Sequence, residues 1–270
     1  MKKIVSRVLD AILAVVLTLS LSLCFVSCGS KGITLEQLKA NGALVIATSP
    51  DFPPFESLDG NNNVSGIEID ILKAICADLG VELKIKQMNF DSVLPGVKSG
   101  KFNVGVSGIT VTPDRQKNVL FTVPYCLAAQ AIVVKSGSAV TCKADLAGKS
   151  VSVQTGTTAE EFCMANGYNV LAFDANNDAE AAMVQGKVDA WVIDDLTAAA
   201  MVAAYNAEHD DKLVILSEAM TTEPYAFALT FGSEEVAAEM DKTIMKMLAD
   251  GSIAAIFAKY GAPYTAPDAD

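Results

Sequence analysis

The stretch Ile67-Glu-Ile-Asp-Ile-Leu-Lys-Ala-Ile-Cys-Ala-Asp-Leu79 decides the fold, because its apolar residues recur at helical spacing and it stops at Gly80. This periodicity predicts an amphipathic helix that ends at the glycine. The short apolar segment Leu44-Val-Ile-Ala-Thr48 comes before it, and the alternating segment 81–88 comes after it. Both segments predict strands, and strands that alternate with helices predict a largely parallel sheet covered on both faces.

The alternation continues along the chain and then restarts. We predict a helix at 91–98 and a strand at 102–106, and then a second series with strands at 150–154, 169–173 and 189–193 and helices at 157–165 and 179–185. The segments Ser99-Gly-Lys-Phe-Asn-Val104 and Gln185-Gly-Lys-Val-Asp-Ala190 share the pattern of a helix end, a Gly-Lys turn and a strand. The two series therefore predict two similar α/β lobes.

Two connecting segments predict how the lobes are joined. The apolar run 125–135 is long enough to cross to the second lobe, and the run 222–229 is long enough to cross back. We predict a discontinuous first lobe, residues 43–127 and 223–270, a second lobe, residues 128–222, and a two-strand hinge. Ligands of open α/β sheets bind beyond the carboxyl ends of the strands, so the predicted site is a cleft between the lobes.

The N-terminus has the pattern of a secretory leader, with Lys2, Lys3 and Arg7 before an almost wholly apolar run. Cys28 resembles the lipidated cysteine of the bacterial lipobox, although Phe25 stands where leucine is usual. We predict a lipoprotein signal peptide at 1–27, followed by a lipid anchor, a linker and a short helix at 28–42, which tether an exported protein to the cell membrane. The alternative is an uncleaved transmembrane anchor, which leaves the protein on the same side.

The composition excludes several classes of function. A net charge of −12 and a pI near 4.5 argue against a nucleic-acid partner, which clustered lysine and arginine would attract. The single histidine, His209, lies in a polar stretch, so we predict no metal centre, no histidine-based triad and no cofactor. Cys76 and Cys163 lie in amphipathic runs and are predicted to be buried thiols. Whether Cys126 and Cys142 form a disulfide stays open.

The segment Ser107-Gly-Ile-Thr-Val-Thr-Pro-Asp-Arg115 has the composition of a carboxylate receptor, because it presents hydroxyls, backbone amides and one guanidinium after a predicted strand. Arginine holds a carboxylate through two parallel charge-assisted hydrogen bonds, and a helix N-terminus adds unsatisfied N–H groups. We therefore expect a ligand with a free carboxylate. The alternative is that Thr112-Pro-Asp-Arg115 merely starts a helix, with Thr112 as its N-cap and the arginine in solvent.

Five motifs, taken in order, resemble those of the family 3 solute-binding proteins, the polar amino-acid receptors of bacterial ABC importers. They are Ala47-Thr-Ser-Pro-Asp-Phe-Pro-Pro-Phe-Glu56, Gly66-Ile-Glu-Ile-Asp70, Gly108-Ile-Thr-Val-Thr-Pro-Asp-Arg115, Thr155-Gly-Thr157 and Asp189-Ala-Trp-Val-Ile-Asp194. Each motif alone is weak, but their order across residues 33–262 is specific. The resemblance implies the type II periplasmic-binding-protein-like fold, in which two lobes close on a ligand.

The resemblance also implies how an amino acid would be held. Arg115 would bind the α-carboxylate, together with the amide and hydroxyl of Thr110 and with Thr157 of the second lobe. Asp194 would accept the α-ammonium group, directly or with the carbonyl of Gly108. Opposite charges on facing walls suit a zwitterion. The alternative for Asp194 is an N-cap of the following helix.

Two aromatic residues and two polar residues match the positions that surround the ligand side chain in this family. Phe52 and Phe90 would sandwich that side chain, or they would be plugs of the core. Ser49 and Gln154 would line the pocket and would suit an uncharged polar ligand such as glutamine or cystine. Many relatives carry an acidic residue where this chain has Ser49, so a basic ligand needs a carboxylate from elsewhere.

The sequence therefore predicts a binding protein and not an enzyme. We expect a monomeric, lipid-tethered receptor that closes on a polar L-amino acid and presents it to an ABC permease. The permease's ATPase would supply the energy, because this chain has no P-loop pattern. A basic ligand would rely on Asp51 or Glu56 for its carboxylate. The alternative on the same fold is a cyclohexadienyl dehydratase, with Glu56 or Glu223 as general acid.

Overall fold

The computed structural model describes residues 32–217 and 220–267, so the predicted signal peptide and the lipidation site at Cys28 lie outside the described residues. The elements in chain order are α2 (Leu35–Asn41), β1 (Ala43–Thr48), β2 (Asp51–Phe52), β3 (Glu56–Leu58), β4 (Val64–Ser65), α3 (Ile67–Leu79), β5 (Glu82–Gln87), α4 (Phe90–Lys98), β6 (Val104–Gly105), α5 (Pro113–Gln116), β7 (Leu120–Phe121), β8 (Cys126–Ala128), β9 (Gln130–Lys135), a 3-10 helix (Lys143–Leu146), β10 (Ser150–Gln154), α6 (Thr158–Ala165), β11 (Asn169–Phe173), α7 (Asn176–Val184), β12 (Ala190–Asp194), α8 (Asp195–Glu208), β13 (Leu213–Ile215), β14 (Glu223–Tyr225), β15 (Ala228–Leu229), α9 (Glu234–Ala249) and α10 (Ser252–Lys259).

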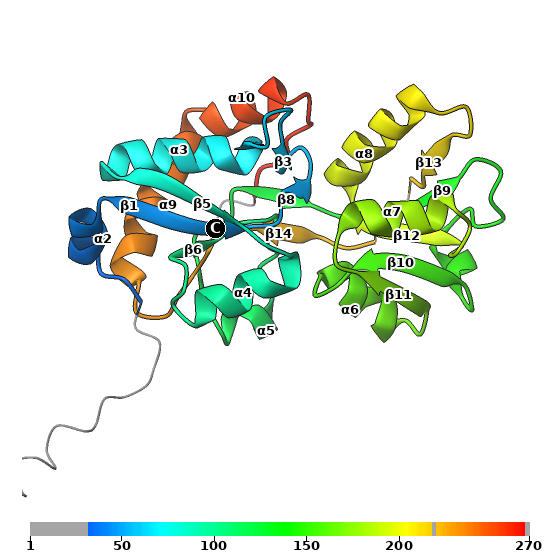
Figure 1. Cartoon of the computed structure of the whole chain (residues 1–270), viewed down its shortest axis with the longest axis horizontal. Coiled ribbons are helices and arrows are strands. Elements are labelled where there is room, and N and C mark those ends of the chain that lie inside the picture. The colour runs from blue at the N-terminus through cyan, green and yellow to red at the C-terminus, as the bar shows by residue number, and fades with distance from the viewer. Residues whose placement is uncertain (1–31, 218–219, 268–270) are drawn as a thin grey trace, which may run out of the picture. The chain divides into compact units, whose positions relative to one another are not determined.

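The first lobe is built on a sheet with the strand order β5-β1-β6-β15-β7. Strand β1 pairs in parallel with β5 and with β6, and α3 is the helix expected from the 67–79 periodicity. Gly80 ends α3 with φ of +71°, a left-handed conformation that glycine adopts without a steric penalty. Helices α3 and α10 lie on one side of the sheet and α4 lies on the other, so both faces are covered (Figure 1).

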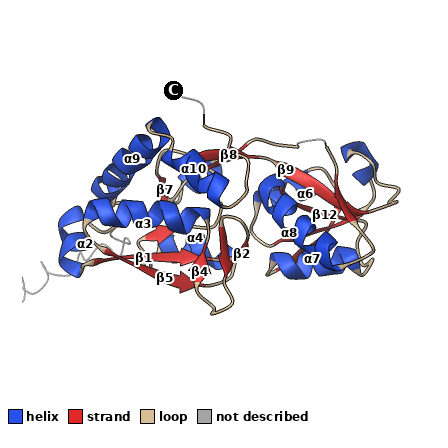
Figure 2. Cartoon of the chain, turned by 90° about the horizontal axis from the view of Figure 1, so that it is seen from above, coloured by secondary structure: helices blue, strands red, loops and turns tan. Residues whose placement is uncertain are grey.

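The second lobe repeats this plan with the strand order β11-β10-β12-β9-β13. Strand β10 pairs in parallel with β11 and β12, as the sequence predicts. Successive residues of β12 enter different cores, because side chains alternate across a strand. Trp191 and Ile193 join the core packed by α7 and α8, whereas Ala190 and Val192 join the core packed by α6. Figure 2 shows these helices grouped around the second sheet.

Both sheets are largely parallel, as the sequence predicts, but neither is purely parallel. In each sheet one strand runs antiparallel to its neighbours: β15 in the first sheet and β9 in the second. These strands directly follow β14 and β8, which pair with each other in a separate two-stranded sheet. A segment that enters a sheet from the cleft must run against strands whose carboxyl ends face that cleft. The crossing segments therefore become the antiparallel strands.

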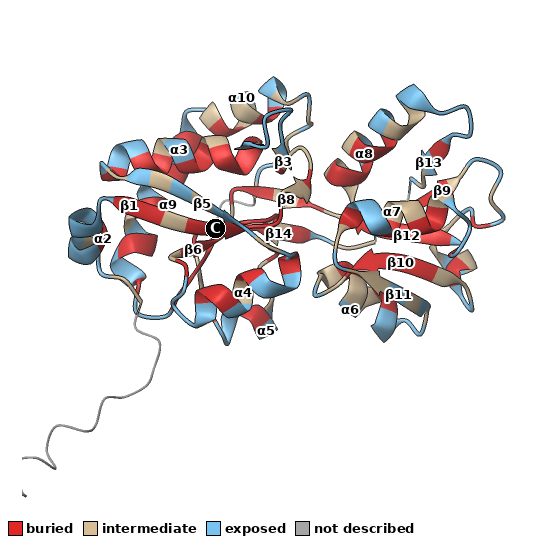
Figure 3. Ribbon diagram, in the orientation of Figure 1, coloured by how far each residue is buried: buried red, intermediate tan, exposed pale blue. Residues whose placement is uncertain are grey.

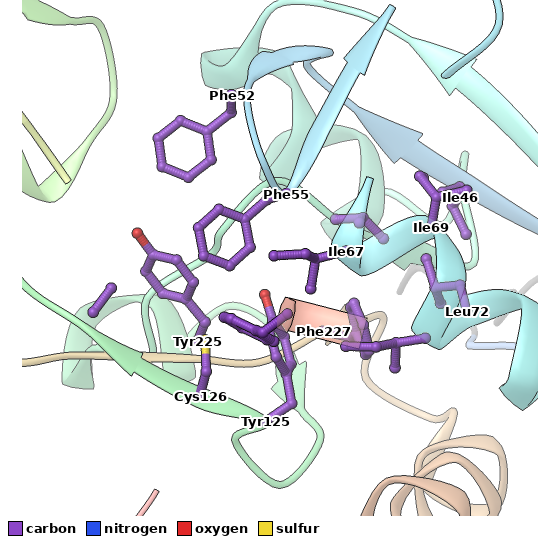
Figure 4. Close-up of a cluster of buried hydrophobic side chains, with 14 of the residues drawn as sticks. Ile46, Phe52, Phe55, Ile67, Ile69, Leu72, Tyr125, Cys126, Tyr225 and Phe227 are labelled. Carbon is purple, nitrogen blue, oxygen red and sulfur yellow. The ribbon is translucent and has the colours of Figure 1, made fainter. Parts of the chain in front are cut away.

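Buried aromatic side chains fix the crossing strands to the first lobe. Tyr125 and Tyr225 are fully buried, and the ring centroid of Tyr225 lies 5.1 Å from that of Phe55 (Figure 4). The rings of Tyr125 and Phe227 stack with centroids 5.0 Å apart. The same cluster continues to Phe52, whose ring stacks on Phe55 at 5.6 Å. In Figure 3 the crossing strands β8 and β14 are coloured mainly as buried, whereas the helices carry exposed residues.

Candidate functional site

A pocket between the two lobes brings together most of the residues that the sequence predicts for the site. Its accessible volume is about 10 Å³, about the room of one water molecule. Eight of the nine predicted ligand-binding residues line it, and Ser49 does not. The lining residues are Phe52, Phe90, Ser107, Gly108, Thr110, Arg115, Gln154, Thr157, Thr158 and Asp194.

The Arg115 guanidinium is held rigidly by both lobes. Thr112 caps the short helix α5 by accepting a hydrogen bond from the Arg115 backbone N–H at 3.2 Å. The alternative interpretation is therefore correct that this segment starts a helix with Thr112 as its N-cap. The side chain is nevertheless buried and not in solvent, with 8% of its surface exposed. Its Nη1 donates to the Thr110 carbonyl at 3.0 Å, and its Nη2 donates to the Gly156 carbonyl at 3.1 Å. A guanidinium has five N–H donors, so others are left for an anion.

The electrostatic surroundings of Arg115 favour an anionic partner. Burial lowers the pKa of the guanidinium, and the nearby carboxylates of Glu161, Glu223 and Asp194 act in the opposite direction. Arginine stays protonated in proteins because its ordinary pKa is above 12. A buried cation is costly unless it is paired and hydrogen-bonded. A ligand carboxylate would supply such a pair within the pocket.

Asp194 is the carboxylate of the pocket, and it occupies the N-cap position of α8. It ends β12 and precedes α8, but its side chain makes no capping hydrogen bond. Instead it accepts a hydrogen bond from the side-chain amide of Gln130. Burial and the nearby carboxylate of Glu223 raise the pKa of Asp194, whereas the charge of Arg115 lowers it. The capping alternative is therefore right about the position of Asp194 but not about a side-chain cap. The adjacent Asp195 accepts hydrogen bonds from the Leu196 N–H at 2.8 Å and from the Ala129 N–H at 3.2 Å.

The loop after β6 forms the wall of the pocket on the first lobe. Gly108 has φ of +53°, and its backbone N–H donates to the Glu68 carboxylate at 3.0 Å. A Cβ atom at this position would lie 2.4 Å from the ring of Phe52. Thr110 forms a backbone bridge with Tyr225, which ties the loop to the crossing strand. The loop is thus held in place by Glu68 and Tyr225, which do not line the pocket.

The Gly108→Ala variant is expected to weaken ligand binding by roughly tenfold or more. The added methyl group would have to displace the Phe52 ring, and the alanine would have to adopt a strained left-handed backbone conformation. Isothermal titration calorimetry would measure the change. Gly137→Ala is a matched control, since it has φ of +80° and nothing within 4 Å of the added Cβ. Equal affinities in the two variants would contradict the importance of the close Gly108–Phe52 contact.

Each of the two predicted aromatic residues lines the pocket and also packs in a core. Phe52 is 7% exposed and belongs to the aromatic cluster of the first lobe. Phe90 is 8% exposed and is the first residue of α4, one residue before the predicted start of this helix. The guanidinium carbon of Arg115 lies 5.7 Å from the centroid of the Phe90 ring, within the range of a cation–π contact.

Ser49 and Gln154 face a hydrogen-bond network that the sequence did not reveal. Ser49 donates from Oγ to the Asp51 carboxylate at 2.7 Å. Gln154 donates from Nε2 to the same carboxylate at 3.0 Å and to the Asp174 carbonyl at 3.1 Å. Its Oε1 accepts from the side-chain amide of Asn176 at 2.9 Å. Both N–H groups of the Gln154 amide are therefore used within the protein.

Two further lining residues, Ser107 and Thr158, were not among the predicted site residues. Ser107 belongs to the segment singled out in the sequence, and its Oγ donates to Glu56 at 2.5 Å. Thr158 immediately follows Thr157, and its Oγ1 accepts from the side-chain amide of Gln130 at 3.2 Å. Adjacency to predicted residues was the only signal for either one, since serine and threonine are common in loops and helix starts.

The two glutamates that the dehydratase alternative names as general acids, Glu56 and Glu223, do not line the pocket. Glu56 is fully buried, and burial together with the Glu68 carboxylate raises its pKa. Glu223 is 3% exposed, in the crossing strand β14. Neither side chain is part of the pocket lining, so a bound molecule in this pocket would not reach them as general acids.

The remaining predictions from composition can be compared with the described residues. Cys76, Cys126, Cys142 and Cys163 are free thiols, so the disulfide left open between Cys126 and Cys142 is not formed. Within residues 32–217 and 220–267, no group of three or more histidine, cysteine, aspartate or glutamate side chains is arranged to hold a metal. Among the same residues, no helix has the length and apolar character needed to span a membrane.

Comparisons with known proteins agree with the geometry. A model of the bacterial extracellular solute-binding proteins, family 3, matches residues 44–263. The chain is 29% identical over 236 residues to the L-cystine-binding protein TcyJ of Escherichia coli (strain K12), which covers 86% of this chain and 87% of that protein. These relations span almost the whole described chain.

Solved structures are also similar. The arginine-bound form of truncated ArgBP from T. maritima is 37% identical, with a TM-score of 0.74 over 78% of this chain and 99% of that chain. The ancestral amino acid-binding protein AncCDT-1, a precursor of cyclohexadienyl dehydratase, is 31% identical, with a TM-score of 0.77 over 84% of this chain and 98% of that chain. The predicted two-lobe, type II periplasmic-binding-protein fold is confirmed.

Proposed function

Because this chain belongs to the bacterial extracellular solute-binding proteins of family 3, and is a solute-binding protein and not an enzyme, we propose that its pocket holds a polar L-amino acid for an ABC importer. The observation that carries this proposal is the pairing of Arg115, which is buried, and Asp194, which is half-buried, two opposite charges that line one pocket from different lobes. The α-carboxylate of an amino acid would bind the guanidinium, and its α-ammonium group would bind the aspartate. Each charge would then gain a partner.

The pocket lining favours an uncharged polar side chain on the ligand. Asp194 is the only carboxylate among the lining residues, and it is assigned to the ammonium group. Asp51 already accepts three hydrogen bonds, from Ser49, Gln154 and Asn176, and Glu56 faces Ser107 and Glu68 behind the pocket. A basic side chain would therefore lack a free carboxylate. Cystine and glutamine are the ligands that we propose first, and TcyJ, a relative, is named for cystine.

A thermal-shift screen tests this proposal. The chain from Gly29 onward, freed of bound ligand by unfolding and refolding, would be heated with each common amino acid, cystine and ornithine. A ligand at 100 times its dissociation constant adds about 2.7 kcal/mol of stability, or a rise of several degrees in melting temperature. Shifts confined to uncharged polar amino acids would support the proposal. A shift with arginine or lysine would overturn the side-chain assignment, and no shift with any amino acid would overturn the function.

The cellular role follows from the same family membership. We propose that the predicted lobes, residues 43–127 with 223–270 and residues 128–222, close on the ligand as a monomer and that the closed form docks on a permease driven by an ATPase. We further propose that Cys28 is acylated after removal of residues 1–27 and holds the protein on the outer side of the cell membrane. Replacement of Cys28 by alanine should release the protein from the membrane fraction; continued membrane association would favour the transmembrane anchor.

A further inference from the structure

We propose that Asp51 is an interlobe latch: its carboxylate, on the first lobe, caps helix α7 and orients Gln154 on the second lobe, and so stabilises the closed protein with any ligand bound. This inference rests on the proposed function, because it concerns the closure of the same pocket. Asp51 itself does not line the pocket. It is thus a positioning residue and would not contact the ligand.

Asp51 caps the start of helix α7 from the other lobe. Helix α7 begins at Asn176, and its N-cap position is occupied by Ala175, which has no side-chain group to accept a hydrogen bond. The four N–H groups of a helix's first turn need acceptors, and a nearby negative charge also suits the positive end of the helix dipole. The Asn176 N–H donates to Asp51 Oδ2 at 2.7 Å. A residue 125 positions earlier in the chain therefore supplies the cap that α7 lacks in its own sequence.

Asp51 also accepts a hydrogen bond from the pocket residue Gln154. Gln154 Nε2 donates to the same Oδ2 atom at 3.0 Å, and the Asn176 side-chain amide donates to Gln154 Oε1 at 2.9 Å. The carboxylate, the pocket glutamine and the helix start therefore form one closed set of hydrogen bonds. Ser49 donates to the other carboxylate oxygen at 2.7 Å, which fixes the Asp51 rotamer from its own lobe. Strand β2, which carries Asp51, packs beside α7 (Figure 2).

The latch has an energetic consequence for binding. The hydrogen bonds of Gln154 and Asn176 to Asp51 cross between the lobes, so they exist only in the closed protein. The bond from Ser49 lies within the first lobe, so it exists in the open and the closed protein. The apparent affinity of a ligand falls when the binding-competent state is less populated. Loss of the latch should therefore weaken every ligand by the same factor. Because closure slows escape of the ligand, most of the change should appear in the dissociation rate.

The experiment compares variants of the chain from Gly29 onward, with the amino acids that stabilise the wild-type protein as probes. Asp51→Ala should raise Kd by roughly 5- to 30-fold for each of them, as expected from the loss of a helix cap and a charged hydrogen bond. Small-angle X-ray scattering should give a larger radius of gyration for the ligand-free Asp51→Ala variant than for the ligand-free wild-type protein. Glu82→Ala, which removes an exposed carboxylate from the same lobe, is the matched control and should match the wild type.

A second variant separates the latch from a simple effect on stability. Asn176→Asp places a carboxylate in the first turn of α7, where it should stabilise the helix, but the new charge repels Asp51. Both variants should speed ligand dissociation while Asn176→Asp keeps the wild-type melting temperature without ligand. Unchanged dissociation rates in both variants would overturn the latch. A loss limited to basic amino acids would also overturn it, because Asp51 would then be a ligand contact. If no amino acid binds the wild-type protein, the proposed function fails first.

Discussion

Replacing Arg115 by alanine should abolish amino-acid binding, with Kd raised at least 100-fold, while the protein stays folded. Removing one partner of a buried, hydrogen-bonded charge pair costs about 2–5 kcal/mol, and each 1.4 kcal/mol is a tenfold change in Kd. The loss should be large here because Arg115 is the only arginine among the described residues, and its guanidinium is held between the Thr110 and Gly156 carbonyls. Calorimetric titration and far-UV circular dichroism would measure affinity and folding.

Two matched variants make the Arg115 result specific. Arg115→Lys keeps a positive charge but loses the two-pronged geometry, so it should bind more weakly than the wild type and more tightly than the alanine variant. Lys117→Ala, in which an exposed cation is removed two residues away, should bind as the wild type does. Unchanged affinity in a folded Arg115→Ala protein would mean that the carboxylate is bound elsewhere.

Replacing Asp194 by asparagine should weaken α-amino acids by roughly 30-fold or more, but should affect their deaminated analogues far less. Asparagine keeps the shape and a carbonyl acceptor, yet it removes the negative charge that we assign to the ammonium group. Competition titrations with a matched pair of ligands, one with and one without the α-amino group, would measure this difference. Equal losses for both ligands would show that Asp194 acts only as a structural residue.

Asp195→Asn is the control for this experiment. Asp195 accepts hydrogen bonds from the Leu196 and Ala129 N–H groups, so its replacement should lower the melting temperature without changing the preference for an α-amino group. The two adjacent aspartates should therefore separate a binding effect from a stability effect.

The pH dependence of binding follows from the raised pKa of Asp194 in the ligand-free protein. Binding of an ammonium group favours the ionised carboxylate, so the ligand lowers this pKa and binding releases a proton. Affinity should consequently fall as the pH drops through the pKa of Asp194, which lies above the ordinary aspartate value of 3.8. Titrations in buffers with different ionisation enthalpies would detect the released proton. The Asp194→Asn variant should release none.

Several features could be predicted from local sequence because local rules determine them. The 67–79 periodicity and Gly80 define α3 and its end, and Thr112-Pro-Asp-Arg115 contains its own helix start. The order of strands and helices also predicts two lobes and a site at the strand ends. Eight of nine predicted site residues line one pocket, because they follow or precede those strand ends. Their roles in binding stay predictions.

Tertiary structure decided the features that depend on distant partners. The crossing strands became antiparallel members of each sheet because they arrive from the opposite lobe, which no local pattern encodes. The helix predicted at 91–98 begins one residue earlier, at Phe90, and packing places the Phe90 ring 5.7 Å from the guanidinium carbon of Arg115. In the sequence Asp51 was considered only as a carboxylate for a basic ligand, and only folding brought it within 2.7 Å of the Asn176 N–H at the start of α7. By itself, the sequence determined the elements, their order and the chemistry available to the pocket, since spacing and capping act over a few residues. Only the tertiary structure decided which side chains share hydrogen bonds across the lobes, since those contacts depend on how separate elements pack.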